Sequence, residues 1–308
     1  MSEPAGSLRP TAARSPARAL RRALREEPIV RAIEAHNGLT ALIGSNAEVR
    51  GARFHAHWSG SLTTAASKGM PDTGVVTLAQ RIQVLDEIRA SSTRPVLIDA
   101  ESGGDTPEEI VHLTRALEDA QASAIVFEDK VGPKFNSFAG GTASDLADLD
   151  MAVGRIRHAV QARRGPDMLI VGRLEGLVLG LAEEETVVRA LAMQAAGADM
   201  ILPHSKRSQP EQILSFAAAF RAAGGTLPLA AIPTTYAVVD EAMLLDHQFS
   251  LVVYANQLLR AAWQPMIDCA HRILADRSVG PVTESLAPIR DILRIEEFHA
   301  ARLGHEPG

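Results

Sequence analysis

The chain has 308 residues, of which 46% are hydrophobic and 22% are charged, the balance of an ordinary globular protein. A net charge of −6 and an aromatic content of 4% argue against nucleic-acid binding, which needs a basic field and stacking side chains. No apolar run approaches the roughly 20 residues that span a bilayer, and a single cysteine, Cys269, leaves no disulfide framework within one chain. We therefore expect a cytoplasmic protein that acts on a small molecule.

The first 27 residues differ in composition from the rest of the chain. Arginines stand there among alanine, serine and proline, and acidic residues are scarce. Organelle transit peptides have this composition, but a frayed tail that leads into a short amphipathic helix near Ala17–Arg25 is the interpretation we prefer. The sequence thus predicts a flexible basic tail, 1–27, and one domain, 28–308.

Eight short apolar runs alternate with helical patterns along the rest of the chain. The predicted strands are Ile29–Ala35, Ala52–Trp58, Pro95–Asp99, Ser123–Glu128, Met168–Arg173, Asp199–Pro203, Leu227–Ile232 and Phe249–Tyr254. The predicted helices between them include Leu78–Ala90, Pro107–Ala120, Leu146–Ala162, Glu183–Ala196, Pro210–Ala223 and Tyr236–Leu245. Eight such units predict an α/β protein with a closed (β/α)8 barrel of the TIM type. An open doubly wound sheet is the alternative, but no Gly-x-Gly-x-x-Gly fingerprint follows the first strand.

Two further helical runs follow the eighth predicted strand. They cover Gln257–Ala275 and Ser285–Leu303, with a break at Gly280-Pro281. Because a barrel needs only one closing helix, we expect this extension to make contacts between subunits.

Polar residues follow most of the predicted strands, at the barrel edge where catalytic groups collect. Three carboxylates, Asp99, Glu101 and Glu128, would converge from two adjacent strands, and Asp72 could join them from the loop after the second strand. Oxygen ligands of this kind suit Mg2+, whereas the lack of cysteine and the single nearby histidine argue against zinc. The alternative is a pair of solvated loop acids and a salt-bridged Glu128.

Cationic groups are predicted on the far side of the same edge. Arg173 and His204 end neighbouring strands, and a guanidinium fork beside an imidazole suits a phosphoryl or carboxylate group. A structural ion pair with Glu175 is the alternative for each. The turn Ser59-Gly60-Ser61 offers backbone N–H groups that could cradle an anion, although a turn without a ligand explains it equally well.

The most informative stretch is the loop that follows the fourth strand. It brings Lys130, Lys134 and Asn136 next to Glu128, within a segment that contains Gly132 and Pro133. A buried strand that ends in a carboxylate and opens into a loop with two lysines and an amide indicates a metal-assisted site for a small anion.

These residues, in this order, resemble the phosphoenolpyruvate mutase branch of the isocitrate lyase/phosphoenolpyruvate mutase superfamily. The similarity runs from about Glu34 to Ala262, and its specific part is Glu128-Asp129-Lys130, Pro133-Lys134 and Asn136-Ser137. Branches with C–C lyase activity carry a Lys-x-Cys-Gly-His loop there, so a thiol acid/base is excluded in this chain.

The resemblance implies a reaction and a site. The family interconverts phosphoenolpyruvate and phosphonopyruvate, and its last helix is swapped between subunits of a dimer that can pair into a tetramer. Asp99 would bind Mg2+ directly, while Asp72, Glu101 and Glu128 would hold its waters. The remaining implied roles are substrate seating by Trp58, Ser59, Gly60, Ser61 and Leu62, phosphoryl stabilisation by Arg173, His204 and Asn136, and a gating loop that carries Lys130 and Lys134.

The chain departs from the family pattern at two strand ends. The usual Trp-x-Ser-Gly is Trp58-Ser59-Gly60-Ser61, and the usual Asp-x-Asp is Asp99-Ala100-Glu101, so the second acid is one methylene longer. Three alternatives to the mutase stay open: a phosphonopyruvate hydrolase, a C–C lyase or decarboxylase, and a non-catalytic binding barrel. Related hydrolases tend to carry threonine where this chain has Asn136, which favours the mutase.

Overall fold

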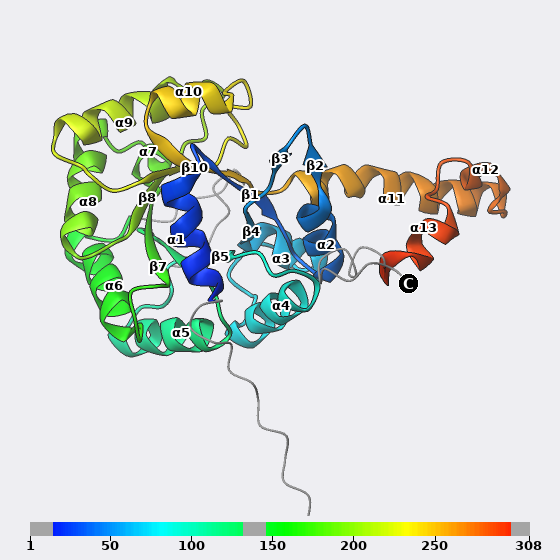
Figure 1. The fold of residues 1–308 in the computed structure, drawn as a ribbon, viewed down its shortest axis with the longest axis horizontal. Helices are drawn as coiled ribbons and strands as arrows, with labels where there is room; N and C mark the ends of the chain where they lie inside the picture. Colours follow the sequence, from blue (N-terminus) through cyan, green and yellow to red (C-terminus); the bar gives the residue numbers. More distant parts are fainter. Residues whose placement is uncertain (1–14, 132–145, 297–308) are drawn as a thin grey trace, which may run out of the picture.

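The computed structural model describes residues 15–131 and 146–296, and within them eight parallel strands close a barrel (Figure 1). In barrel order the strands are β1 (Val30–Glu34), β4 (Ala56–Ser59), β5 (Val96–Asp99), β6 (Ala124–Glu128), β7 (Leu169–Leu174), β8 (Met200–Pro203), β9 (Leu229–Ala231) and β10 (Phe249–Tyr254). Pairing of β1 with β10, from Val30↔Leu251 to Ile33↔Tyr254, closes the ring. The predicted (β/α)8 barrel is confirmed.

Helices surround the ring of strands, and α2, α4 and α5 begin at reciprocal caps. The helices up to the eighth strand are α1 (Pro16–Glu26), α2 (Gly38–Asn46), α3 (Ser61–Ser67), α4 (Leu78–Ser91), α5 (Pro107–Asp119), α6 (Leu149–Ala162), α7 (Gly176–Leu179), α8 (Glu183–Ala195), α9 (Glu211–Ala222) and α10 (Glu241–Asp246). At the start of α4 the Thr77 side chain accepts from the Gln80 amide, and the Gln80 side chain accepts from the Thr77 amide. Thr106 and Glu109 do the same for α5. These caps fix the ends of the loops that carry Asp72 and Glu101.

Two predicted elements differ from the observed ones for local reasons. The strand expected over Ala52–Trp58 is divided into β3 (Ala52–Arg53), which pairs with β2 (Glu48–Val49) in a short hairpin, and the barrel strand β4. Arg50 and Gly51 both have positive φ, as a tight hairpin turn requires. The helix expected from Leu146 begins only at Leu149, because the Asp148 side chain caps it by accepting from the Met151 amide.

The apolar residues form two layers because the strands alternate. One cluster draws members from all eight barrel strands, among them Leu97, Val126 and Leu202, and fills the barrel interior. The other packs the outer faces of the strands against the helices, with members such as Ile125 and Phe216. The charged groups at the barrel mouth, where the carboxyl ends of the strands meet, therefore lie next to an apolar interior.

Helix α1 packs against one end of the barrel. Leu20 is 0% exposed and belongs to the interior cluster, so α1 covers the end of the barrel opposite the strands' carboxyl ends. Arg21 pairs at 2.8 Å with Asp199, which precedes β8, and Arg18 pairs with Asp167, which precedes β7. The short amphipathic helix expected near Ala17–Arg25 is confirmed, and it packs on the barrel by burying Leu20.

The chain leaves the barrel after β10. Helix α11 (Gln257–Asp276) projects away from it and carries α12 (Gly280–Thr283) and α13 (Ile289–Leu293) at its far end (Figure 1). No side chain of α11 is buried within the described chain. Among residues 15–131 and 146–296, no helix combines the length and apolar character needed to cross a membrane.

Candidate active site

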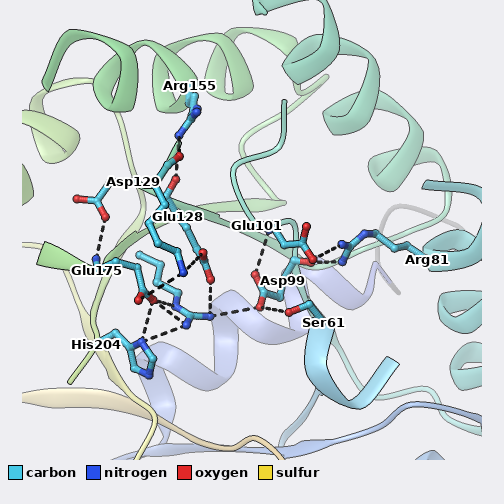
Figure 2. A network of polar contacts seen from close by, with 11 residues as sticks. Ser61, Arg81, Asp99, Glu101, Glu128, Asp129, Arg155, Glu175 and His204 are labelled. Atoms are coloured by element: carbon cyan, nitrogen blue, oxygen red, sulfur yellow. Dashed lines mark hydrogen bonds and ion pairs between the residues drawn. The ribbon is translucent and has the colours of Figure 1, made fainter. Parts of the chain in front are cut away.

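Four of the predicted site residues meet at the carboxyl ends of adjacent strands (Figure 2). Asp99 ends β5, Glu128 ends β6 in register with Arg173 of β7, and His204 directly follows β8. Asp99 is 3% exposed and the other three are also buried. Ionised groups at such depth are costly unless they are paired, and here they are paired with one another.

Arg173 is the centre of this network. Its Nη1 lies 3.2 Å from Asp99 Oδ2 and 3.0 Å from Glu128 Oε1, so one guanidinium edge joins β5 to β6. Its Nε donates to Glu175 Oε1 at 2.7 Å. Arg173 therefore makes the structural ion pair with Glu175 that the sequence left as the alternative, and its contact with a phosphoryl group stays a prediction.

The buried charges shift one another's pKa values. Burial alone would lower the pKa of Arg173, but Glu128, Glu175 and Asp99 outweigh it and raise that pKa. Burial would likewise raise the pKa of Glu175, yet Arg173 and His204 hold it well below the usual range. For Glu128, burial prevails over the attraction of Arg173, and its pKa is raised. Glu175 is thus the firmly ionised carboxylate of the cluster.

His204 is oriented by Glu175. The Nδ1 atom lies 2.8 Å from Glu175 Oε1, and because an ionised carboxylate only accepts, Nδ1 carries the proton and donates. Arg173 Nη2 lies 3.1 Å from the same nitrogen, and two donors do not bond to each other, so that approach is a packing contact. The other ring nitrogen, Nε2, is left to contact a bound group.

Lys130 is fixed at the root of the predicted gating loop. Its Nζ lies 3.0 Å from Glu128 Oε2 and 3.7 Å from Glu175 Oε2, and its backbone forms an antiparallel bridge with Leu146. Lys134 and Asn136 lie outside the described residues, so their roles stay predictions.

A layer of charge behind the mouth was not foreseen from the sequence. Asp129 Oδ1 accepts from the Glu175 amide at 2.8 Å, and Arg189 of α8 lies 3.3 Å from Asp129 Oδ2. Arg155 of α6 donates to the carbonyl oxygens of Glu128 and Lys130, at 3.2 and 2.6 Å. Burial raises the pKa of Asp129 to about 6, although the Glu175 amide and Arg189 oppose this. The only sequence signal for this layer was the position of Asp129 inside the Glu-Asp-Lys motif.

The predicted substrate-binding turn lies beside Asp99. Trp58 is buried in the barrel interior, and a Cβ added to Gly60 would lie 2.5 Å from its Nε1, so no larger residue fits at position 60 without a shift. Ser61 begins α3, and its Oγ donates to Asp99 Oδ2 at 3.2 Å. Ser59 is buried and Leu62 is half-buried in the same turn. The serine that departs from the family pattern is thus a partner of the predicted metal ligand.

The other two predicted metal residues lie at the edge of the cluster. Glu101 has a positive φ of 58°, and its carboxylate lies 2.6 Å from Arg81 Nη2. Asp72 is half-buried on the loop between α3 and α4, and its role stays a prediction. Within the described ranges, no three His, Cys, Asp or Glu side chains form a ready-made cage for a metal ion. That arrangement still suits Mg2+, which binds through one or two carboxylates and keeps several waters.

Comparison with known proteins identifies the family. A family model for phosphoenolpyruvate phosphomutase matches residues 20–274. The chain belongs to the phosphoenolpyruvate phosphomutase family. The resemblance found in the sequence is thereby confirmed, and the match includes every described member of the predicted site.

Individual members of the family and its superfamily differ in their reactions. Phosphonopyruvate hydrolase from Variovorax sp. (strain Pal2) is 30% identical over 279 residues, which cover 90% of this chain and 93% of that protein. The crystal structure of phosphoenolpyruvate phosphomutase from Streptomyces platensis subsp. rosaceus has a TM-score of 0.85 and 31% identity, covering 94% and 97% of the two chains. Phosphonopyruvate hydrolase in complex with oxalate and Mg2+ has a TM-score of 0.83 and 29% identity, with the same coverage. Similarity therefore establishes an enzyme family and leaves the reaction to be argued from residues.

Proposed function

We propose that this chain is a Mg2+-dependent phosphoenolpyruvate mutase, which interconverts phosphoenolpyruvate and phosphonopyruvate and so forms the C–P bond of phosphonates. The observation that carries the proposal is the buried network in which Arg173 faces Asp99 and Glu128 on one side and contacts His204 on the other. A pyruvyl phosphate requires carboxylates that bind a cation, next to cationic groups that bind its phosphoryl group.

The donor set supports Mg2+ as the cation. Three carboxylates, Asp99, Glu128 and Glu175, face two cations, Arg173 and Lys130, so the carboxylates outnumber the cations. Asp99 and Glu128 would hold the ion, directly or through waters, with Asp72 from the neighbouring loop. When bound, Mg2+ supplies positive charge that stabilises an enolate oxygen and the phosphoryl oxygens.

The protein's own residues would position and shield the phosphoryl group. Arg173 would place positive charge beside its oxygens, and His204 would offer Nε2 because Glu175 holds Nδ1. During the reaction the bond from phosphorus to the oxygen on C2 breaks and a bond from phosphorus to C3 forms, so no atom is gained or lost. Such a loose transfer state requires mainly positioning and positive charge, and water must be excluded.

Phosphonopyruvate hydrolase is the second candidate, because a hydrolase matches this chain along 90% of its length. The two reactions would use the same network and differ in whether water reaches the phosphoryl group. Asn136 favours the mutase by the resemblance, since related hydrolases tend to carry threonine there. A C–C lyase or decarboxylase is less favoured, because the loop lacks the cysteine of the lyase branches.

Phosphorus NMR separates these candidates in one experiment. Purified protein is incubated with phosphonopyruvate and Mg2+, and an EDTA-treated sample is the control. We expect a metal-dependent phosphoenolpyruvate signal. Inorganic phosphate alone would identify a hydrolase, and an unchanged spectrum would refute both.

Substitution of Asn136 tests the choice between mutase and hydrolase at one residue. We expect Asn136→Ala to lower mutase turnover by about 100-fold, as the loss of one transition-state donor does, and Asn136→Thr to raise the share of inorganic phosphate. Turnover of Asn136→Ala equal to that of the unchanged protein would remove the basis for preferring the mutase.

We further propose that α11 packs on a second copy of this chain, in a dimer or a tetramer. The 20-residue helix has no buried side chain in one copy, and Trp263 and Met266 are 56% and 58% exposed. On the barrel, Leu39 and Ile43 of α2 are also exposed and offer an apolar surface. Exposed apolar side chains on both parts favour an exchange of helices between subunits.

A further inference from the structure

Arg81 of α4 reaches the strand end that carries Asp99. The arginine is 6% exposed, its Nη1 donates to the Asp99 carbonyl oxygen at 2.7 Å, and its Nη2 lies 2.6 Å from Glu101 Oε1 (Figure 2). A single guanidinium thus holds both ends of the segment 99–101, by two charge-assisted contacts of short length.

The backbone of the same segment is fixed from the other side. The Glu101 amide donates to Asp99 Oδ1 at 3.1 Å, and the Glu101 carbonyl oxygen accepts from the Glu128 amide at 2.7 Å. Glu101 adopts a φ of 58°, which costs a non-glycine residue about 1 kcal/mol or more and persists only where surrounding contacts impose it. Those contacts are the ones that set the direction of the Asp99 carboxylate.

The pairing also separates Glu101 from the other carboxylates. Arg81 balances the charge of Glu101 at 2.6 Å, whereas Arg173 is shared between Asp99 and Glu128. The extra methylene of Glu101, compared with the aspartate usual in the family, gives the side chain the reach to meet a guanidinium on α4.

We infer that Arg81 and Glu101 are a positioning pair that orients Asp99 for the metal, and that Glu101 anchors the strand end instead of holding the metal's waters. The inference rests on the proposed Mg2+ site. Outer partners that orient a metal ligand typically change metal affinity by about 10- to 100-fold when they are removed.

Titration calorimetry with Mg2+ alone tests the pair on the full-length protein. We expect Arg81→Met to weaken Mg2+ binding by about 10-fold or more, because the Asp99 carbonyl and the Glu101 carboxylate lose their shared partner. Glu101→Ala should weaken it similarly, whereas Glu101→Gln should stay within about threefold of the unchanged protein, because its amide oxygen still accepts from Arg81. Equal losses of Mg2+ affinity in Glu101→Ala and Glu101→Gln would mean that the carboxylate charge of Glu101 acts on the metal, and would overturn the inference.

Arg89 provides the matched control on the same helix. Its guanidinium is bound to the Ala120 carbonyl oxygen and to Gln121, away from the mouth, so Arg89→Met should leave Mg2+ affinity unchanged. If Arg81→Met does not fold, as circular dichroism would reveal, Arg81→Lys takes its place, because lysine keeps the charge but cannot bridge both oxygens. Full Mg2+ affinity in Arg81→Lys would also overturn the inferred positioning role of the pair.

The test distinguishes this inference from the proposed function. Unchanged protein that binds Mg2+ and converts phosphonopyruvate, beside an Arg81 variant that binds Mg2+ equally well, would refute the pair and leave the mutase intact. Unchanged protein that binds no Mg2+ would refute both.

Discussion

The barrel mouth and the C-terminal arm, which consists of α11, α12 and α13, depart from the usual distribution of side chains in opposite ways. At the mouth, Asp99, Glu128 and Arg173 are buried although they are charged, and along α11 the side chains of Trp263 and Met266 are exposed although they are apolar. The buried charges compensate one another within the chain, whereas the exposed apolar side chains of α11 have no cover within the described residues. This difference agrees with the two proposals, a small anion with Mg2+ at the mouth and a second copy of the chain against α11.

The largest effect is expected from removing the central cation of the mouth. Arg173→Met should lower phosphonopyruvate turnover by about 10³-fold, and it should cost about 3–5 kcal/mol of unfolding free energy because Asp99, Glu128 and Glu175 lose their shared partner. Arg173→Lys should regain part of the stability and little of the turnover, since lysine lacks the fork. Steady-state kinetics and urea denaturation measure both, and turnover within tenfold of the unchanged protein would disprove the central role.

Helix α1, unlike the C-terminal arm, packs its apolar side chain Leu20 on the barrel of its own chain. Leu20→Ala should lower the unfolding free energy by about 3 kcal/mol, because it leaves a cavity at the end of the barrel interior. Arg22→Ala, whose side chain makes an exposed pair with Glu26, is the control and should change stability by less than about 0.5 kcal/mol. Equal melting temperatures for the two variants would restore the view of this segment as a tail.

A charge placed on the arm should separate subunits without affecting the fold of the barrel. We expect Trp263→Glu to weaken self-association by about 100-fold, as the loss of a central aromatic contact does. Gln264→Ala, on the same helix but bonded to Asp268, should leave the association unchanged. Sedimentation velocity over a concentration series gives the result, and a monomeric unchanged protein would refute the proposed exchange of helices.

A smaller effect on stability is expected from His57, a buried histidine that stays neutral in the folded protein. Burial lowers the pKa of His57 to about 3, and its Nε2 lies 2.8 Å from Ser92 Oγ. The unfolded chain takes up this proton near pH 6.5, so the stability that His57 contributes is complete above that pH and is lost as the pH falls toward about 3.

His57→Gln should therefore remove a part of the pH dependence of stability. Between pH 8 and pH 5 the unfolding free energy of the unchanged protein should lose about 2 kcal/mol through this one group. The exposed His112 is the control, and His112→Gln should keep the full loss. Chemical denaturation at the two pH values measures the difference, and equal pH dependence in both variants would contradict the buried, neutral state.

The barrel could be predicted because each strand is a continuous apolar run, and the site because polar residues follow those runs. The partners that come from helices could not be predicted in this way. Arg81, Arg155 and Arg189 lie in helical patterns where an arginine is normally solvated, and only their contacts with the strand ends and the loops beside them reveal them. The sequence predicts helix α1 near Ala17–Arg25, but it does not reveal that Leu20 of this helix packs on the barrel interior.

The bridge between Lys130 and Leu146 holds two points of the chain together on either side of residues 132–145. Because the Ala147 amide also donates to the Asp129 carbonyl oxygen, the chain leaves and re-enters the barrel at one anchored point. An exchange of residues 132–145 would therefore begin and end at positions that the barrel already holds in place.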